Sequence, residues 1–227
     1  MTATTVVFDL DGTLIDTAPD LINAANHVLA GAGLGAVPGA VLQPFISFGS
    51  RRMIEEGLAF HGHKLPAAEI DRMWHAFLAT YADNIAVDSR PYPHLENVLG
   101  EIARSGARLA VCTNKPESLS RKLLDALGLS DRFAAICGRD TFAVCKPHPD
   151  HLRLTIERAG GKATHAIMVG DSDTDVATAK AAGIPIIGVG FGYSDVPMRE
   201  LRPDALIEDY TAFAGAMARL ERAFDRA

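Results

Sequence analysis

The sequence predicts an α/β protein, a doubly wound parallel sheet with a helical domain inserted after its first strand. Three observations support this fold class. The chain has 227 residues, more than one typical domain and fewer than two. Short apolar runs alternate with helical stretches over most of its length, which is the pattern of a parallel sheet covered by helices on both faces. Between about residues 16 and 87, helical periodicity alone replaces this alternation.

The first strand is expected at residues 4–10, a β-branched and apolar run that ends in acids and a glycine. Residues 16–86 follow with apolar side chains at helical spacing, and we assign them to a helical cap. The remaining segments, 1–15 and 87–227, would form the α/β core. Because the insertion follows the first strand at once, it should lie beside the carboxyl end of that strand, where open α/β sheets bind ligands.

The alternation of helices and strands returns after Pro93. Helices are expected at residues 95–104, 117–127, 151–159 and 172–182 and from residue 209 onward. Strands are expected at residues 108–112, 134–137, 166–169, 185–189 and 205–207. Cys112 and Cys137 lie inside two of these apolar runs, and the sequence contains no CxxC pair. We therefore interpret both as small core residues in a reducing compartment rather than as nucleophiles or zinc ligands.

Composition and charge exclude several classes of protein. With 48% hydrophobic and 22% charged residues, the chain is too apolar for intrinsic disorder. The net charge of −6 and the lack of a basic run argue against a nucleic-acid partner. The longest weakly polar stretch, residues 183–192, has about half the length needed to cross a bilayer. Asp9 and Asp11 interrupt any secretory leader, so we expect a cytoplasmic protein without a membrane partner.

Two aspartates follow the first predicted strand, in the segment DLDGT at residues 9–13. Side chains two residues apart on an extended chain point the same way, so Asp9 and Asp11 can aim their carboxylates into one crevice. Two such charges repel unless a cation or a shared proton relieves them, and Mg²⁺, a hard cation that prefers oxygen ligands, meets that demand. A turn in which Asp and Gly simply end the strand gives the same pattern. The segment alone leaves both interpretations open.

A second acidic cluster, GDSDTD at residues 170–175, follows another apolar run and opens a predicted helix. Ser172 is the expected N-cap, and Asp173 and Asp175 would interact favourably with the helix dipole, so both can be helix-starting residues. Asp171 precedes the cap at the exit of the strand. It can therefore reach the same crevice as Asp9, and it is our candidate for a third metal ligand.

Two further segments supply groups that complement the acids. The run at residues 108–112 ends in Thr113 and Asn114, which offer a hydroxyl and backbone N–H groups suited to phosphate oxygens. Either residue can instead simply cap the next helix. Lys146 precedes Pro147, which favours an extended backbone there. A surface lysine beside a proline is common, so this signal is weak by itself.

The acidic pair, the hydroxyl, the lysine and the third acid occur in this order, each at or near a strand-to-helix transition. As a set, DLDGT, TN, KP and GDSDTD resemble the four motifs of the haloacid dehalogenase superfamily of phosphohydrolases, and the match spans nearly the whole chain. The helical insertion is similar to the superfamily's first type of cap. The chain is most similar to the phosphoglycolate phosphatase branch, which RPYP at 90–93, KPHP at 146–149 and FGY at 191–193 support more weakly.

The resemblance implies a covalent mechanism. Asp9 would attack phosphorus and form an aspartyl-phosphate, while Asp11 would protonate the leaving alkoxide and later activate water. Mg²⁺ would be held by Asp9, by Asp171 and by the backbone carbonyl of Asp11. The dehalogenase relatives lack an acid at the position of Asp11, since a halide leaving group needs no proton. The resemblance therefore favours an oxygen-linked phosphate as the substrate.

The resemblance also implies which residues support the phosphoryl transfer. Lys146, Thr113 and Asn114 would bind and stabilise the transferring phosphoryl group, whose charge spreads over its equatorial oxygens. Asp175 would orient Lys146 or a water on the metal. The implied substrate is a small phosphate monoester, 2-phosphoglycolate, which would be hydrolysed to glycolate and phosphate.

Substrate choice should reside in the cap. The segment at residues 46–52 resembles the family's cap loop, although Ser47 replaces a glycine often found there. Arg51 or Arg52 can bind a substrate carboxylate through a bidentate fork. A helix that begins at Ser50 would equally place both arginines on its solvated face.

Other functions remain open from the sequence. A phosphomutase would keep the phosphate on a sugar, and a sugar-phosphate phosphatase or a pyrophosphatase would use the same scaffold on another substrate. A binding module that uses Asp9 as a signalling phospho-acceptor is disfavoured by the long insertion and by Asp11. The sequence leaves the oligomeric state open.

Overall fold

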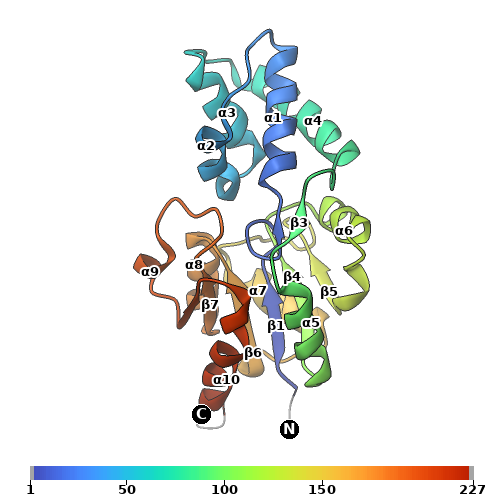
Figure 1. The fold of residues 1–227 in the computed structure, drawn as a ribbon, viewed down its shortest axis with the longest axis vertical. Helices are drawn as coiled ribbons and strands as arrows, with labels where there is room; N and C mark the ends of the chain where they lie inside the picture. Colours follow the sequence, from blue (N-terminus) through green and yellow to red (C-terminus); the bar gives the residue numbers. More distant parts are fainter. Residues whose placement is uncertain (1–2, 225–227) are drawn as a thin grey trace.

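The computed structural model describes residues 3–224 and contains a six-stranded sheet with a layer of helices above one end (Figure 1). All neighbouring strands in the sheet are parallel. Their order across the sheet is β5 (Ala135–Cys137), β4 (Arg108–Cys112), β1 (Thr5–Phe8), β6 (Ala166–Gly170), β7 (Ile186–Val189) and β8 (Ala205–Ile207). The predicted fold class, a doubly wound parallel sheet with a helical insertion, is confirmed.

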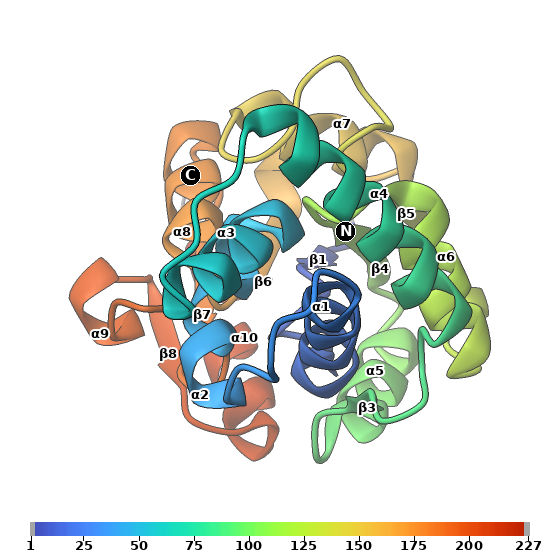
Figure 2. The same cartoon turned by 90° about the horizontal axis from the view of Figure 1, so that it is seen from above.

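Helices cover both faces of this sheet (Figure 2). They are α5 (Leu95–Arg104), α6 (Glu117–Ala126), α7 (Pro149–Arg158), α8 (Asp173–Ala182), the short α9 (Met198–Leu201) and α10 (Phe213–Phe224). Alternate residues of β1 face opposite sides: Val6 and Phe8 pack with α5, α6 and α10, whereas Val7 packs with α7 and α8. All three are fully buried, which explains why the strands read as continuous apolar runs.

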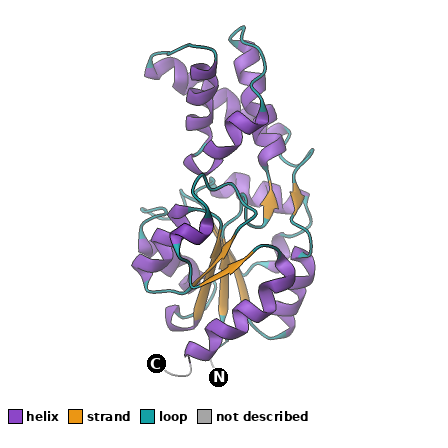
Figure 3. Ribbon diagram, turned by 60° about the vertical axis from the view of Figure 1, so that its left-hand side comes forward, coloured by secondary structure: helices purple, strands orange, loops and turns teal. Residues whose placement is uncertain are grey.

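The helical layer contains α1 (Ala18–Gly31), α2 (Gly39–Leu42), α3 (Ser50–Phe60) and α4 (Ala67–Asp83), with a 3₁₀ turn at Gln43–Phe48. Its helices form because apolar residues recur at helical spacing, and Leu21, Ala25 and Leu29 of α1 are buried against α3 and α4. The layer lies over the carboxyl ends of the strands (Figures 1 and 3). No helix within residues 3–224 has both the length and the apolar character needed to cross a bilayer.

Two strands too short for sequence patterns to indicate join the layer to the sheet. β2 (Ile15–Asp16) pairs antiparallel with β3 (Arg90–Pro91). Asp20 tethers the returning segment, because its carboxylate accepts hydrogen bonds from Ser89 N at 2.8 Å and Ser89 Oγ at 2.6 Å. The chain therefore crosses between sheet and layer as a paired ribbon.

The bounds of two predicted elements differ slightly from those in the structure. The first strand spans only Thr5–Phe8, so Asp9 directly follows it, and its backbone N–H still donates to the Val169 carbonyl of β6 at 2.9 Å. The terminal helix begins later than residue 209, because the Asp209 side chain accepts from Thr211 N at 2.7 Å and starts a 3₁₀ turn before α10. Cys112 and Cys137 are buried side by side on β4 and β5, as expected for core residues.

Candidate functional site

The predicted site residues gather at one edge of the sheet. Asp9, Thr113 and Asp171 directly follow β1, β4 and β6, and β1 lies between the other two strands. Because parallel strands end at the same edge, their following residues share one crevice. A cavity of about 250 Å³ lies there, lined by these three residues, by Lys146 and by side chains of the helical layer above.

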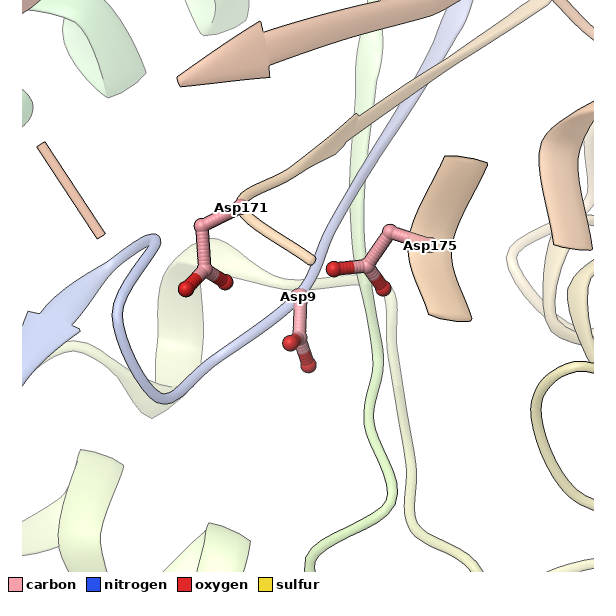
Figure 4. A group of neighbouring side chains, drawn as sticks. All are labelled: Asp9, Asp171 and Asp175. Carbon is pink, nitrogen blue, oxygen red and sulfur yellow. The ribbon is translucent and has the colours of Figure 1, made fainter. Parts of the chain in front are cut away.

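Three buried carboxylates form the centre of the site (Figure 4). Asp9, Asp171 and Asp175 each contribute one oxygen to a group whose members all lie within 4.8 Å of one another. Asp9 comes from the end of β1, Asp171 from the end of β6 and Asp175 from the first turn of α8. Their residues are 8%, 2% and 0% exposed. Three negative charges this close and this dry repel strongly unless positive charge lies among them.

Lys146 supplies one positive charge. Its Nζ lies 2.9 Å from Asp9 Oδ1 and 2.6 Å from Asp175 Oδ1. The backbone around it is held from both sides: Lys146 N donates to His151 Nδ1 at 3.1 Å, and Asn114 Nδ2 donates to the Lys146 carbonyl at 2.9 Å. The loop therefore fixes this lysine far more firmly than the neighbouring proline alone would.

Asp171 is oriented by two donors. Thr13 Oγ1 donates to Asp171 Oδ1 at 2.9 Å, and Tyr193 N donates to Asp171 Oδ2 at 2.8 Å. Each carboxylate oxygen has a second lone-pair direction available for a metal.

Asp175 serves both the helix and the site. Its Oδ2 accepts from Ser172 N at 3.1 Å and from Ser172 Oγ at 2.7 Å, which completes a capping box, while its Oδ1 accepts from Lys146. Asp173 is exposed, and among the described residues its side chain bonds only to its neighbour Thr174. The structure thus separates a helix-starting acid, Asp173, from an acid that also orients the lysine.

Thr113 and Asn114 lie at the site in different ways. Thr113 lines the cavity, is 2% exposed and accepts a bond from Lys115 N at 3.2 Å through its Oγ1. Asn114 also lines the cavity, but its Nδ2 is used by Lys146, and its Oδ1 is buried without a partner among the described residues.

Asp11 is turned towards the helical layer, away from the three-carboxylate group. Its Oδ1 accepts from Lys115 Nζ at 2.9 Å and from Thr17 Oγ1 at 2.7 Å, and its Oδ2 lies 3.2 Å from the same ammonium. The ammonium also lies over the ring of Tyr81 in α4, 4.3 Å from its centroid. Asp11 and Asp9 therefore share the cavity but have different partners.

The structure does not bring Arg51 to the site. Because α3 begins at Ser50, Arg51 lies on the outer face of the helix, where it pairs with Asp71 and, at 3.5 Å, with Glu55. Its side chain is 41% exposed, and Arg51 is absent from the described cavity lining. Arg52 pairs with Glu56 at 2.6 Å in the same way. The solvated helix face, the alternative open from sequence, is the arrangement observed.

Burial and repulsion between the carboxylates raise the pKa of two acids of the centre, Asp9 and Asp171. Burial, reinforced by Asp175 and opposed by Lys146, raises the pKa of Asp9 from 3.8 to about 6. Burial, with Asp175 and Asp9, raises the pKa of Asp171 to about 8. Burial alone would lower the pKa of Lys146, but Asp175 and Asp9 outweigh it and raise the pKa, so the lysine stays charged. The centre thus has more negative charge than its lysine balances.

A divalent cation fits this donor set. All candidate ligands are oxygens, as Mg²⁺ prefers, and the excess negative charge is what such an ion relieves. In addition, the buried Asp9 Oδ1 has no hydrogen bond of proper geometry from any described residue, despite its short contact with Lys146. Asp9 and Asp171 can ligate, whereas both oxygens of Asp175 already accept hydrogen bonds.

Substitution of Gly192 should disturb this centre. A Cβ at Gly192 would lie 2.2 Å from Asp171 Cβ, so Gly192→Ala must displace Asp171 or its loop. We expect the half-maximal Mg²⁺ concentration, measured by a titration of activity, to rise roughly 10-fold or more. The matched control is Gly215→Ala in α10, where an added Cβ meets no atom of residues 3–224 within 4 Å. An unchanged Mg²⁺ requirement in Gly192→Ala would contradict a metal role for Asp171.

Several residues of the site were not singled out from the sequence. Lys115 carried one available signal, since it follows the same strand as Thr113 and precedes a helix. Thr13 and Tyr193 lie in the quoted segments DLDGT and FGY, but no site role was predicted for either, and His151 carried no signal. The roles of all three depend on which loops meet in the folded chain. Tyr193 also donates through its hydroxyl to Asp16 Oδ1 at 2.6 Å, which connects the centre to the ribbon beneath the helical layer.

Comparison with known proteins places this geometry among related chains. The family model described as haloacid dehalogenase-like hydrolase matches residues 6–189. A phosphoglycolate phosphatase of Mesorhizobium japonicum is 51% identical over 219 residues, which cover 96% of each chain. One of Agrobacterium fabrum is 46% identical over 211 residues, which cover 93% of this chain and 91% of the relative.

A solved structure is similar over nearly the whole length of both chains. The crystal structure of a predicted phosphoglycolate phosphatase from Haemophilus somnus has a TM-score of 0.87 and 26% identity, and the match covers 95% of this chain and 98% of that one. The similarity therefore extends over the sheet and the helical layer, and the family match includes Asp9, Lys146 and Asp171.

Proposed function

The chain belongs to the haloacid dehalogenase-like hydrolases, and we propose that it is a Mg²⁺-dependent phosphatase that hydrolyses 2-phosphoglycolate to glycolate and phosphate. The observation that carries the reaction type is the meeting of Asp9 with Lys146 and Asp171 in one cavity that also contains Asp11. The choice of substrate is supported by the relatives that bear this activity in their names.

Asp9 is the nucleophile in the proposed mechanism. One carboxylate oxygen forms a bond to phosphorus while the bond from phosphorus to the ester oxygen breaks, and Asp11 gives its proton to the leaving alkoxide. The products of this step are glycolate and an aspartyl-phosphate. Asp11 then takes a proton from water, which attacks phosphorus and releases phosphate and the Asp9 carboxylate. The different surroundings of the two acids support this division of roles.

The surrounding groups stabilise charge on the phosphoryl oxygens. Lys146 is charged and paired with both Asp9 and Asp175, and Thr113 adds a hydroxyl at the neighbouring strand end. Asp9, Asp171 and the Asp11 backbone carbonyl would hold Mg²⁺, which supplies further positive charge when bound. Asp175 keeps Lys146 in place. Asn114 supports phosphate binding indirectly in this proposal, because its Nδ2 donates to the Lys146 carbonyl at 2.9 Å and so positions the loop that carries the lysine.

Residues 16–86 act as a cap in this proposal, and residues 1–15 and 87–227 as the catalytic core. The support is that the helical layer lies over the strand ends and joins the sheet through the β2–β3 ribbon. Ser50, Trp74 and Tyr81 of the layer line the same cavity as Asp9. Such a layer can exclude water from the reacting phosphate.

A phosphate-release assay tests the function. We expect multiple turnovers on 2-phosphoglycolate, loss of activity after removal of Mg²⁺ with EDTA, and recovery when Mg²⁺ is restored. The comparison set is glucose 6-phosphate, glucose 1-phosphate and pyrophosphate. Preference for a member of that set would replace the proposed substrate, isomerisation of a hexose phosphate without release would indicate a mutase, and a single slow phosphorylation would indicate a phospho-acceptor.

A further inference from the structure

We propose that Lys115 and Tyr81 form a second anion-binding subsite, which receives the carboxylate of the substrate and selects anionic phosphate esters. This inference rests on the proposed phosphatase function and extends it, because it names the residues that recognise the part of the substrate that does not react.

Lys115 occupies an unusual place for a lysine. Its side chain is only 5% exposed, and it lines the cavity together with Asp9 and Asp11. The ammonium is stabilised there by the Asp11 carboxylate and by the face of the Tyr81 ring. A charge held in such dry surroundings interacts far more strongly with a second anion than an exposed lysine would.

The Tyr81 hydroxyl is unpaired among the described residues, and the ring of this residue lies beneath the Lys115 ammonium. The residue is 1% exposed and lines the cavity, and its hydroxyl is buried without a partner among residues 3–224. A buried hydroxyl without a partner is unfavourable, so an oxygen of a bound ligand would stabilise it. The ammonium and the hydroxyl are both donors, which suits a carboxylate.

The order of groups in the cavity matches the order of groups in 2-phosphoglycolate. Phosphorus must lie at Asp9, and the ester oxygen must lie at Asp11 if Asp11 protonates it. The ammonium of Lys115 lies one contact beyond Asp11, 2.9 Å from Oδ1 and 3.2 Å from Oδ2. In the substrate, a single methylene separates the ester oxygen from the carboxylate. The substrate carboxylate then replaces the longer of the two contacts between Lys115 and Asp11.

The other basic side chains at the cavity are less suitable. Lys146 lies between Asp9 and Asp175, at the phosphate end. Arg139 lines the cavity but is exposed at its rim. Arg51 does not line the described cavity, because it is paired on the outer face of α3. Of the described basic residues that line the cavity, Lys115 is therefore the one that is both buried and next to the leaving-group acid.

The test compares two substrates that differ at one end. Lys115→Met keeps the length of the side chain and removes its charge, and the matched control is Lys122→Met, an exposed lysine of α6. The substrates are 2-phosphoglycolate and 2-hydroxyethyl phosphate, in which a neutral hydroxymethyl group replaces the carboxylate. We expect Lys115→Met to lower kcat/KM for 2-phosphoglycolate roughly 10- to 100-fold more than for the neutral ester. Tyr81→Phe should also lower kcat/KM more for 2-phosphoglycolate than for the neutral ester, but by a smaller factor. Lys122→Met should change kcat/KM for neither substrate.

A binding measurement separates recognition from turnover. 3-Phosphonopropionate has the shape of 2-phosphoglycolate but cannot be hydrolysed, and propylphosphonate lacks its carboxylate. Calorimetry with Mg²⁺ present should show that the wild type prefers 3-phosphonopropionate and that Lys115→Met loses this preference. Equal losses on both substrates, or an unchanged binding preference, would overturn the subsite. If the wild type instead fails to hydrolyse 2-phosphoglycolate, the proposed function fails, and the binding preference still decides whether the subsite exists.

Discussion

Asp9→Asn should abolish hydrolysis while the protein remains folded. The amide has nearly the shape of the carboxylate, but it cannot act as the nucleophile, so kcat should fall on the order of 10⁴-fold or more. Steady-state phosphate release measures this, and intact-mass spectrometry of the wild type after rapid quenching should detect the phosphorylated chain that the variant lacks. The matched control is Asp173→Asn, which changes an exposed acid in the other acidic segment and should leave kcat nearly unchanged. Substantial turnover by Asp9→Asn would exclude covalent catalysis at this residue.

The same variant should be more stable than the wild type when Mg²⁺ is removed. The pKa of Asp9 rises from 3.8 to about 6 in the fold, so between these values the native state binds more protons than the unfolded state. Stability in EDTA therefore falls as pH rises through this window, and above it the charged Asp9 is unfavourable. Urea unfolding at pH 5 and at pH 8 gives the free energy of unfolding of the wild type and of Asp9→Asn. The difference between the two proteins should be larger at pH 8. A difference independent of pH would contradict the charge argument.

Lys146→Met should have the largest effect on stability. The ammonium is buried between Asp9 and Asp175, at 2.9 and 2.6 Å, and its removal leaves three carboxylates without a compensating charge. Removal of one partner of a buried ion pair typically costs about 3–5 kcal/mol. Urea unfolding in EDTA measures the loss, and kcat should also fall on the order of 10²- to 10³-fold or more, because a charged group on the phosphoryl oxygens is lost.

Mg²⁺ should partly restore the stability of Lys146→Met, because a divalent cation at the three carboxylates replaces some of the missing charge. The control is Lys122→Met, whose free energy of unfolding should change little. If Lys146→Met loses less than about 1 kcal/mol in EDTA, the value typical of an exposed ion pair, the centre is not organised around this lysine.

Much of the fold and part of the site could be predicted from the chain because both follow from local patterns. Strands buried on both faces read as apolar runs, and the acids of DLDGT and GDSDTD follow two of them. A parallel sheet puts the ends of such strands at one edge, so the approach of Asp9 and Asp171 could be expected before their distances were known. The short β2–β3 pair could not, since two residues have no periodicity.

Local sequence patterns could not predict the position of the cap arginine Arg51. The sequence indicated both a cap loop and a helix that begins at Ser50. The same local sequence is compatible with an Arg51 that binds a carboxylate and with an Arg51 on the solvated helix face. Packing of α3 against α4 decided between them, because it placed Asp71 beside the guanidinium.

By itself, the sequence determined the α/β class, the inserted helices and the order of the candidate site residues, since these depend on periodicity and on residues next to strand ends. Only the tertiary structure decided that Lys115 contacts Asp11 beneath Tyr81, that Tyr193 holds Asp171 and that Arg51 faces outward. Each of these contacts joins segments far apart in the chain. Their distances depend on how the helical layer and the loops pack on the sheet, and no local pattern encodes that packing.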